Sequence, residues 1–93
     1  MKNHIMQVIF KKTFLKDIDR IPLEIQSKVK QIAFIEIPKI ENLGQLQHHK
    51  KLLGFKDFHR IRLGDYRIGF KFENNKLTFY RVLHRKEIYK YFP

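Results

Sequence analysis

The feature that most constrains the fold is the alternation of apolar and polar residues in three successive stretches of the second half of the chain. Each stretch is rich in the branched and aromatic residues that favour strands. Two residues separate the first two stretches and three separate the last two, and the turn residues Gly64 and Asn74 lie in these gaps. Both residue types tolerate the positive φ of tight hairpin turns, so the pattern predicts an antiparallel meander. The three predicted strands are residues 58–63, 66–72 and 76–83.

With both turns fixing the register, this meander has one apolar face and one open, basic face. The apolar face carries Ile61, Leu63, Tyr66, Ile68, Phe70, Phe72, Leu77, Phe79 and Leu83. The open face carries Arg60, Arg62, Arg67, Gly69, Lys71, Thr78, Tyr80 and Val82, with no acidic residue among them. Arg81 falls on the apolar face, so either a bulge shifts the last strand or the guanidinium reaches past the sheet edge.

A strand and two helices are predicted before the meander. Residues 4–10 read as a strand, and Thr13 is a suitable N-cap for a helix that follows it. Pro22 suits the first turn of a second, amphipathic helix, which Pro38 ends or kinks. The expected fold is α+β, with the N-terminal strand and a helical hairpin packed on an antiparallel sheet.

The remaining segments are shorter and less regular. Residues 38–54 are predicted to be mainly connecting structure, and residues 85–92 a short helix or a docked tail. A chain of 93 residues has room for one domain, which we expect to span residues 1–93.

The charge balance indicates the kind of partner. Twenty Lys and Arg residues against nine Asp and Glu residues leave a net charge of +11. Such an excess is typical of proteins that bind nucleic acid or an acidic partner. The absence of cysteine excludes a disulfide scaffold, thiol catalysis and a Cys-ligated zinc site.

Neither a membrane segment nor a cofactor is expected. No apolar run approaches the roughly 20 residues of a membrane span, and the start of the chain lacks a signal-peptide pattern. These features predict a cytoplasmic protein. His48 and His49 are adjacent but have no Cys or carboxylate at ligand spacing, so no metal site is predicted.

The predicted open face places arginines where they repel one another. Arg62 lies opposite Arg67 across the first hairpin, and Arg60 projects from the same face. Directly opposed like charges destabilise a sheet unless an anion lies between them. Arginine matches phosphate oxygens with a planar fork of donors and keeps its charge. The alternative is that exposed strand positions simply take long charged side chains that prevent aggregation.

Other side chains are expected to extend this basic surface. Lys71 adds charge, while Tyr80 and Tyr89 offer ring faces on which bases of single-stranded RNA can stack. His84 and Arg85 follow at the end of the last strand, where a side chain can lean over the sheet.

Three motifs in this order resemble the RelE/ParE toxin superfamily of bacterial type II toxin–antitoxin systems. They are KKLLGF at 50–55, RIRLGDYRIGF at 60–70 and VLHRKEIYKYF at 82–92. The resemblance covers essentially the whole chain. It implies a RelE-like fold and, in the RelE branch, a metal-independent endoribonuclease that cleaves mRNA in the ribosomal A site. It also implies a cognate antitoxin whose acidic or amphipathic tail wraps around the toxin.

By position, the resemblance implies a role for each motif residue. Arg60 and Arg62 match a basic pair that contacts the region of the scissile phosphate. Arg67 matches an arginine that stabilises the phosphate. Arg85 matches the closing arginine, and Tyr89 matches a C-terminal tyrosine involved in stacking or acid–base chemistry.

Cleavage without a metal requires the ribose 2′-oxygen to attack the adjacent phosphorus while the 5′-oxygen leaves. The reaction needs a proton acceptor, a proton donor and cations for the developing charge. Arginine holds its proton too firmly to transfer it. His84 is therefore the first candidate for proton transfer, because imidazole titrates near neutrality, followed by Tyr89 and Glu87. His59 alternates onto the apolar face and is expected to be a core or edge residue.

Two other functions remain open at this point. One is a ParE-like inhibitor of DNA gyrase without nuclease activity. The other is an inactive relative that only binds nucleic acid. The joint presence of Arg67, Arg85 and Tyr89 favours the nuclease.

Overall fold

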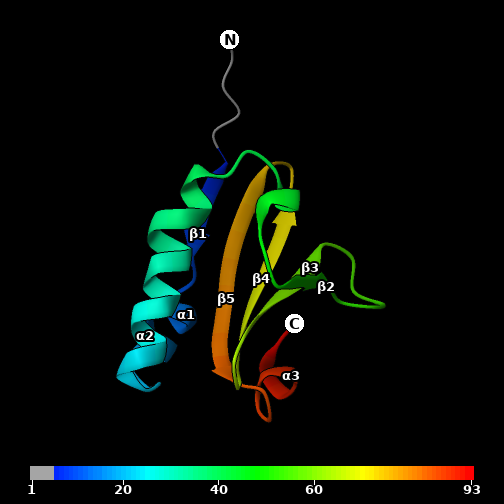
Figure 1. Cartoon of the computed structure of the whole chain (residues 1–93). Coiled ribbons are helices and arrows are strands. Elements are labelled where there is room, and N and C mark those ends of the chain that lie inside the picture. The colour runs from blue at the N-terminus through cyan, green and yellow to red at the C-terminus, as the bar shows by residue number, and fades with distance from the viewer. Residues whose placement is uncertain (1–5) are drawn as a thin grey trace.

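A mixed sheet with the strand order β1-β5-β4-β3-β2 forms the centre of the protein (Figure 1). The structure, a computed structural model, describes residues 6–93. Its antiparallel meander consists of β3 (Phe58–Leu63), β4 (Tyr66–Glu73) and β5 (Lys76–His84), which confirms the strands predicted from alternation. Gly64, Asn74 and Asn75 adopt the positive φ angles expected of the two turns.

Two short strands extend the meander at its edges. β1 (Gln7–Phe10) pairs with β5 in parallel, so the sheet is not purely antiparallel. β2 (His49–Lys51) pairs antiparallel with β3, and the expectation that residues 38–54 only connect is wrong there. Positions 4 and 5 of the predicted first strand lie outside the described residues.

The helices α1 (Lys12–Ile18) and α2 (Leu23–Lys30) cover one face of the sheet, and α3 (Ile88–Tyr91) lies on the other side (Figure 1). α1 and α2 form the predicted hairpin, with Pro22 at the N-cap of α2. α2 continues through the π-helical η1 (Gln31–Glu36) into the 3₁₀ turn η2 (Ile37–Lys39). This segment ends one residue after Pro38, the residue predicted to end or kink the helix. A second 3₁₀ turn, η3 (Leu43–Gln45), precedes β2, and α3 follows β5. Within residues 6–93, no helix has the length and hydrophobicity to cross a bilayer.

The core fills the space between these helices and the sheet. Phe14 of α1 stacks on Phe79 of β5 with ring centroids 4.8 Å apart, and Phe10 stacks on Phe79 at 5.5 Å. Burying each large apolar side chain stabilises the fold by about 1.5–3 kcal/mol. The fully buried side chains include Phe14, Val29, Ala33, Ile37, Ile68, Phe70, Leu77, Phe79 and Val82.

A β-bulge explains the anomalous position of Arg81. Arg81 pairs with Gly69, but Phe79 pairs with the next residue, Phe70, so Tyr80 is an additional residue on β5. Beyond the bulge, each β5 residue faces the side opposite to the predicted one. Val82 is consequently buried in the core, while the predicted core residue Leu83 lies opposite Arg67.

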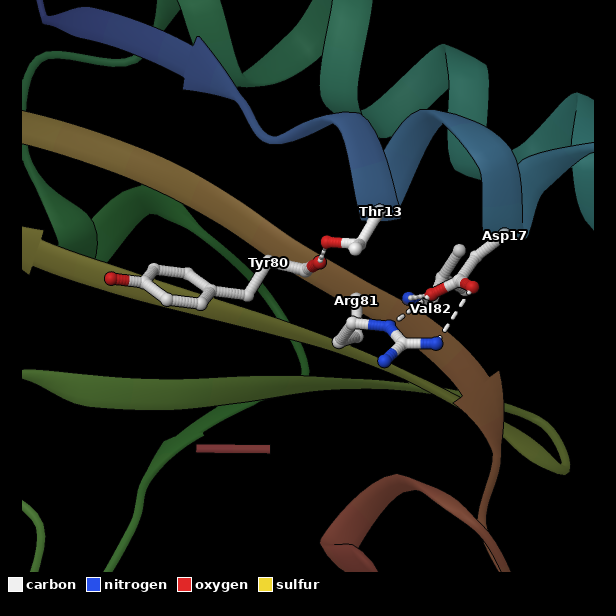
Figure 2. A network of polar contacts seen from close by, with 5 residues as sticks. All are labelled: Thr13, Asp17, Tyr80, Arg81 and Val82. Carbon is white, nitrogen blue, oxygen red and sulfur yellow. Dashed lines mark hydrogen bonds and ion pairs between the residues drawn. The ribbon is translucent and has the colours of Figure 1, made fainter. Parts of the chain in front are cut away.

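Beyond the end of β1, α1 takes the place of a neighbouring strand along β5. The Thr13 hydroxyl donates to the Tyr80 carbonyl at 2.9 Å, and the Val82 N–H donates to the Asp17 carboxylate at 3.1 Å (Figure 2). Arg81 donates to both oxygens of that carboxylate, at 2.7 and 3.0 Å (Figure 2). Thr13 is therefore not the N-cap of α1, a position that Lys11 occupies.

Candidate nucleic-acid interface

Four arginines gather on the sheet face that α1 and α2 leave uncovered. β3 and β4 place Arg62 directly opposite Arg67, as predicted, and place Arg60 opposite Gly69. The bulge turns Arg85 toward the same face, and the backbone N–H of Arg85 donates to the Asp65 carbonyl at 2.7 Å. Arg60, Arg62, Arg67 and Arg85 are called the arginine cluster from here on.

The electrostatics of Arg67 reflect how near these side chains lie to one another. Its pKa is lowered, first by burial and then by the positive charges of Arg60 and Arg62. Arg85 also lowers the pKa of Arg67, whereas Tyr89 acts in the opposite direction. A cation whose charged form is disfavoured in this way is stabilised when an anion binds beside it.

The protein's own carboxylates do not neutralise most of the cluster. Arg67 donates to the carbonyls of Gly64 and Tyr66 at 2.6 and 2.9 Å, which position the guanidinium without removing its charge. Across residues 6–93, the arginine cluster forms one ion pair, between Arg85 and Asp65 at 3.5 Å. Both side chains of that pair are largely exposed, and such pairs contribute about 0–1 kcal/mol. The cluster is therefore available to an anionic ligand.

Lys71 and Tyr80, also predicted to bind RNA, belong to a different part of this face. Lys71 pairs with Glu73 at 2.7 Å, so the expectation of a face without acidic residues is wrong at this end of the sheet. The Tyr80 ring packs edge-on against Phe58, and the Lys11 ammonium lies 4.7 Å from its centroid. Lys11, Lys71, Glu73 and Tyr80 line a separate hollow of about 460 Å³ beside the β4–β5 turn.

The C-terminal tail divides the face into these two parts. Phe92 is buried and lies over Gly69, where an added Cβ would come within 2.5 Å of the ring. Its ring also makes edge contacts with Phe58 and Tyr80, at 5.6 and 5.8 Å. The predicted docked tail is confirmed. A glycine inside a strand often marks such a close approach, and Gly69 was the signal available in the sequence.

His84 is not part of the arginine cluster. The bulge turns it toward the helix side of the sheet, where its ring makes an edge contact with Tyr66 at 5.3 Å. Its Nδ1 accepts a hydrogen bond from the Lys86 N–H at 3.1 Å. The expectation that His84 leans over the basic face is therefore wrong, and Arg85 takes that position.

Of the other predicted proton-transfer groups, Tyr89 lies nearest the cluster. It precedes the buried tail in α3, is 55% exposed, and is close enough to influence Arg67 electrostatically. The Glu87 carboxylate instead lies 3.4 Å from the Lys90 ammonium. The structure thus brings together Tyr89 and four arginines, and leaves His84 and Glu87 outside.

His59 lies in the core, as predicted. It is buried and stacks on Phe70 with ring centroids 5.0 Å apart. Burial lowers its pKa, as do the charges of His49 and Lys51, against an opposing effect of Asp57. Within residues 6–93, no group of three or more His, Cys, Asp or Glu side chains is arranged to hold a metal ion.

The sequence interpretation missed Asp17, which anchors Arg81. Asp17 is 2% exposed and lies on the α1 face that packs on β5. The signal was Arg81, because the predicted register put its charge on the apolar face, where it would need a partner. Asp17 and Arg81 join α1 to β5, and the ion pair leaves Arg81 without a free charge to offer a ligand.

Comparisons with known proteins agree with the overall fold. The family model described as "ParE toxin of type II toxin-antitoxin system, parDE" matches residues 8–89. Toxin RelE3 of Methanocaldococcus jannaschii is 43% identical over 89 residues, which are 95% of this chain and 100% of the relative.

Two solved structures share the fold over most of the chain. One is a chain of the RelB-RelE antitoxin-toxin complex from Methanococcus jannaschii, with a TM-score of 0.72 and 41% identity over 91% of this chain and 99% of that chain. The other is a chain of the toxin-antitoxin complex RelBE2 from Mycobacterium tuberculosis, with a TM-score of 0.66. That match has 24% identity, covers 86% of this chain and 98% of the other, and shows similarity of fold alone.

Proposed function

Because the chain belongs to the RelE/ParE superfamily and is a type II toxin of the RelE kind, we propose that it is a ribosome-dependent endoribonuclease. It cleaves mRNA in the ribosomal A site without a metal ion. The ribose 2′-oxygen attacks the adjacent phosphorus, the 5′-oxygen leaves, and the products are a 2′,3′-cyclic phosphate and a 5′-hydroxyl end. The protein therefore acts where ribosomes are, in the cytoplasm.

The observation that carries this proposal is the arginine cluster. Arg60, Arg62 and Arg67 project from two adjacent strands and form no ion pair within the described part of the chain. A phosphodiester bound among them offsets the repulsion that lowers the pKa of Arg67. The excess of eleven positive charges over the whole chain attracts RNA to this face.

Each residue of the interface has a role in this mechanism. The carbonyls of Gly64 and Tyr66 hold the Arg67 guanidinium in place. There it stabilises the charge that develops on the phosphoryl oxygens. Arg60, Arg62 and Arg85 bind the phosphates on either side. The phenol of Tyr89 is the proton-transfer group nearest to this site, and we assign it that role in place of His84.

Lys71 and Tyr80 contact a more distant part of the same strand. The docked Phe92 separates them from the arginine cluster, so they contribute to binding and not to the chemical step. Lys11 and Lys76 line the same hollow and strengthen its positive charge.

The protein has a cognate antitoxin as its partner. The similar archaeal toxin chain was solved in a complex named RelB-RelE antitoxin-toxin. The net charge of +11 favours an antitoxin tail that is acidic as well as amphipathic. Such a tail neutralises the toxin by covering the arginine cluster.

The test uses purified toxin and ribosomes programmed with a defined mRNA. We expect breaks within the A-site codon, products that carry 2′,3′-cyclic phosphate, and complete resistance when a 2′-deoxy nucleotide is placed at the cleaved position. Absence of cleavage would refute the proposal.

A second candidate function is inhibition of DNA gyrase, because the description of the matching family model names the ParE toxin. DNA breaks that depend on gyrase, in the absence of mRNA cleavage, would favour this function. Ribosome binding with neither kind of break would identify an inactive nucleic-acid-binding relative.

A further inference from the structure

The helical turn that carries Tyr89 is too short to hold its own position. α3 consists of four residues and lies on the side of the sheet opposite α1 and α2 (Figure 1). Isolated helices shorter than about 12–15 residues are marginal in water, because too few hydrogen bonds offset the cost of forming the first turn. The place of the Tyr89 phenol is therefore set by the contacts that hold α3 against the sheet.

Tyr89 has open space on one side. It is 55% exposed and borders an apolar hollow of about 260 Å³ between the β2–β3 loop and the C-terminal segment. Leu52, Leu53 and Phe55 line this hollow from the loop, and Leu53 is 94% exposed. A loop that leaves such a space beside Tyr89 does not fix the position of its ring.

The residue that ties the end of α3 to the sheet is Phe92, three positions after Tyr89. Phe92 is 2% exposed, and its ring lies on the backbone of Gly69 in β4. The same ring makes edge contacts with Phe58 of β3 and Tyr80 of β5. One side chain thus joins the C-terminal segment to the three central strands of the sheet.

The position that Phe92 occupies lies next to Arg67. Gly69 and Arg67 are two residues apart on β4, so both positions face the same side of the sheet, about 7 Å apart along the strand. Tyr89 and Phe92 are three residues apart across one helical turn, a spacing that brings two side chains to the same side. With Phe92 on Gly69, Tyr89 is brought toward Arg67, in agreement with its electrostatic effect on that guanidinium.

We propose that Phe92 is a positioning residue for mRNA cleavage, because its ring, packed on Gly69, holds the Tyr89 phenol within reach of the reacting phosphodiester. This inference rests on the proposed function and deepens it. A group that transfers a proton acts only within about 2.6–3.2 Å of its partner atom. A misplacement of about 1 Å can slow a reaction by about 100-fold. Phe92 is buried, so it acts through Tyr89 and not through contact with RNA.

The alternative is that Phe92 only stabilises the fold. A purely structural role predicts that the loss of Phe92 slows cleavage whatever residue stands at position 89. Positioning predicts a loss only when Tyr89 is present, since without the phenol nothing remains to be positioned. A double-mutant cycle separates the two roles, because residues that act through one another are not additive.

The test measures single-turnover cleavage of A-site mRNA on programmed ribosomes over a range of toxin concentrations. The variants are Phe92→Ala and Phe92→Leu, each in the wild-type chain and combined with Tyr89→Phe. Tyr91→Ala is the matched control, because it removes a ring that is 58% exposed from the same turn. That ring lies over the Arg81 guanidinium, at 5.3 Å. Circular dichroism and thermal unfolding verify that each variant is folded.

In the wild-type chain, Phe92→Ala should lower the maximal rate by roughly 10- to 100-fold and leave the half-saturating toxin concentration unchanged. Phe92→Leu keeps an apolar group on Gly69 and should restore most of the rate. With Tyr89→Phe already present, Phe92→Ala should cause no further loss. Tyr91→Ala should cleave at nearly the wild-type rate.

Equal slowing by Phe92→Ala with and without the Tyr89 phenol would overturn the inference, because Phe92 would then only support the fold. Wild-type rates in either Phe92→Ala or Tyr89→Phe would also overturn it. If Phe92→Ala does not fold, Gly69→Ala provides the same comparison, since its added methyl group displaces the Phe92 ring. Failure of the proposed function has a different signature, because wild-type toxin itself would then leave the mRNA intact, and the inference would be overturned with it.

Discussion

The guanidinium of Arg81 donates two hydrogen bonds to the carboxylate of Asp17, which lies 64 residues earlier in the chain. The same carboxylate accepts the Val82 N–H, so one buried side chain joins α1 to the bulged edge of β5. The hydrogen bond to Asp17 is also the main cause of a raised pKa at Arg81.

Removing Asp17 should therefore destabilise the protein strongly. Asp17→Ala leaves Arg81 without its partner and the Val82 N–H without an acceptor, and breaking a buried pair in this way costs about 3–5 kcal/mol. Urea unfolding measures the loss. Asp17→Leu combined with Arg81→Met should recover much of it, because neither charge remains. If the free energy of unfolding of Asp17→Ala lies within about 1 kcal/mol of the wild-type value, the ion pair is not a structural anchor.

Gly69→Ala should release the C-terminal tail from the sheet. The new methyl group would lie 2.5 Å from the Phe92 ring, and forcing atoms into a packed site costs about 1–3 kcal/mol. Amide hydrogen exchange should show faster exchange at residues 88–92. Phe92→Ala is the comparison, since it frees the tail without crowding. If the tail of Gly69→Ala is as well protected from exchange as that of wild type, the contact between Gly69 and Phe92 is not tight.

The stability of the protein should fall in mildly acidic solution because of His59. Its pKa is lowered from the ordinary 6.5, chiefly by burial, so below pH 6.5 the unfolded chain binds a proton that the folded protein does not. The stability linked to His59 is complete above pH 6.5 and decreases as the pH falls toward the lowered pKa. His59→Phe keeps an aromatic ring on Phe70 and should flatten this part of the curve in thermal unfolding between about pH 5 and 7. If stability depends on pH in His59→Phe as it does in wild type, groups other than His59 cause the dependence.

Binding to ribosomes should weaken steeply as salt increases, because contacts to phosphate release counterions. Sedimentation with ribosomes at a series of KCl concentrations gives the slope of log affinity against log salt. Arg62→Ala should reduce the magnitude of the slope by about one. A slope near zero for wild type would indicate a target other than RNA.

The alternating pattern predicted the three-stranded meander because both turns contain residues that tolerate positive φ. The position of Arg81 made a bulge in the last strand one of two possible explanations, but the pattern could not choose it or place it at Tyr80. One extra residue leaves the composition of the strand unchanged and reverses only the orientation of the residues after it. That reversal explains why His84 was placed in the site and why Leu83 was placed in the core. The three residues of β2 are too few to show alternation, so only their pairing with β3 in the folded chain reveals them.

The candidate site was predictable where it depends on the first hairpin. The position of Arg62 opposite Arg67 follows from a two-residue turn alone. The apolar hollow that Leu53, Phe55 and Tyr89 line was not predictable, because it depends on how the β2–β3 loop and the C-terminal segment meet in the folded protein.

The most direct test of the central claim is the rate of A-site mRNA cleavage by Arg67→Ala, compared with wild type and with Arg20→Ala. Arg20 is an exposed arginine in the turn between α1 and α2, so its loss removes the same charge far from the interface. Single-turnover cleavage on programmed ribosomes should be slower for Arg67→Ala by roughly 100- to 1,000-fold, as when a donor to developing charge is removed. Arg20→Ala should cleave at nearly the wild-type rate. Equal rates for all three proteins would contradict the assignment of the arginine cluster as the site of phosphate stabilisation.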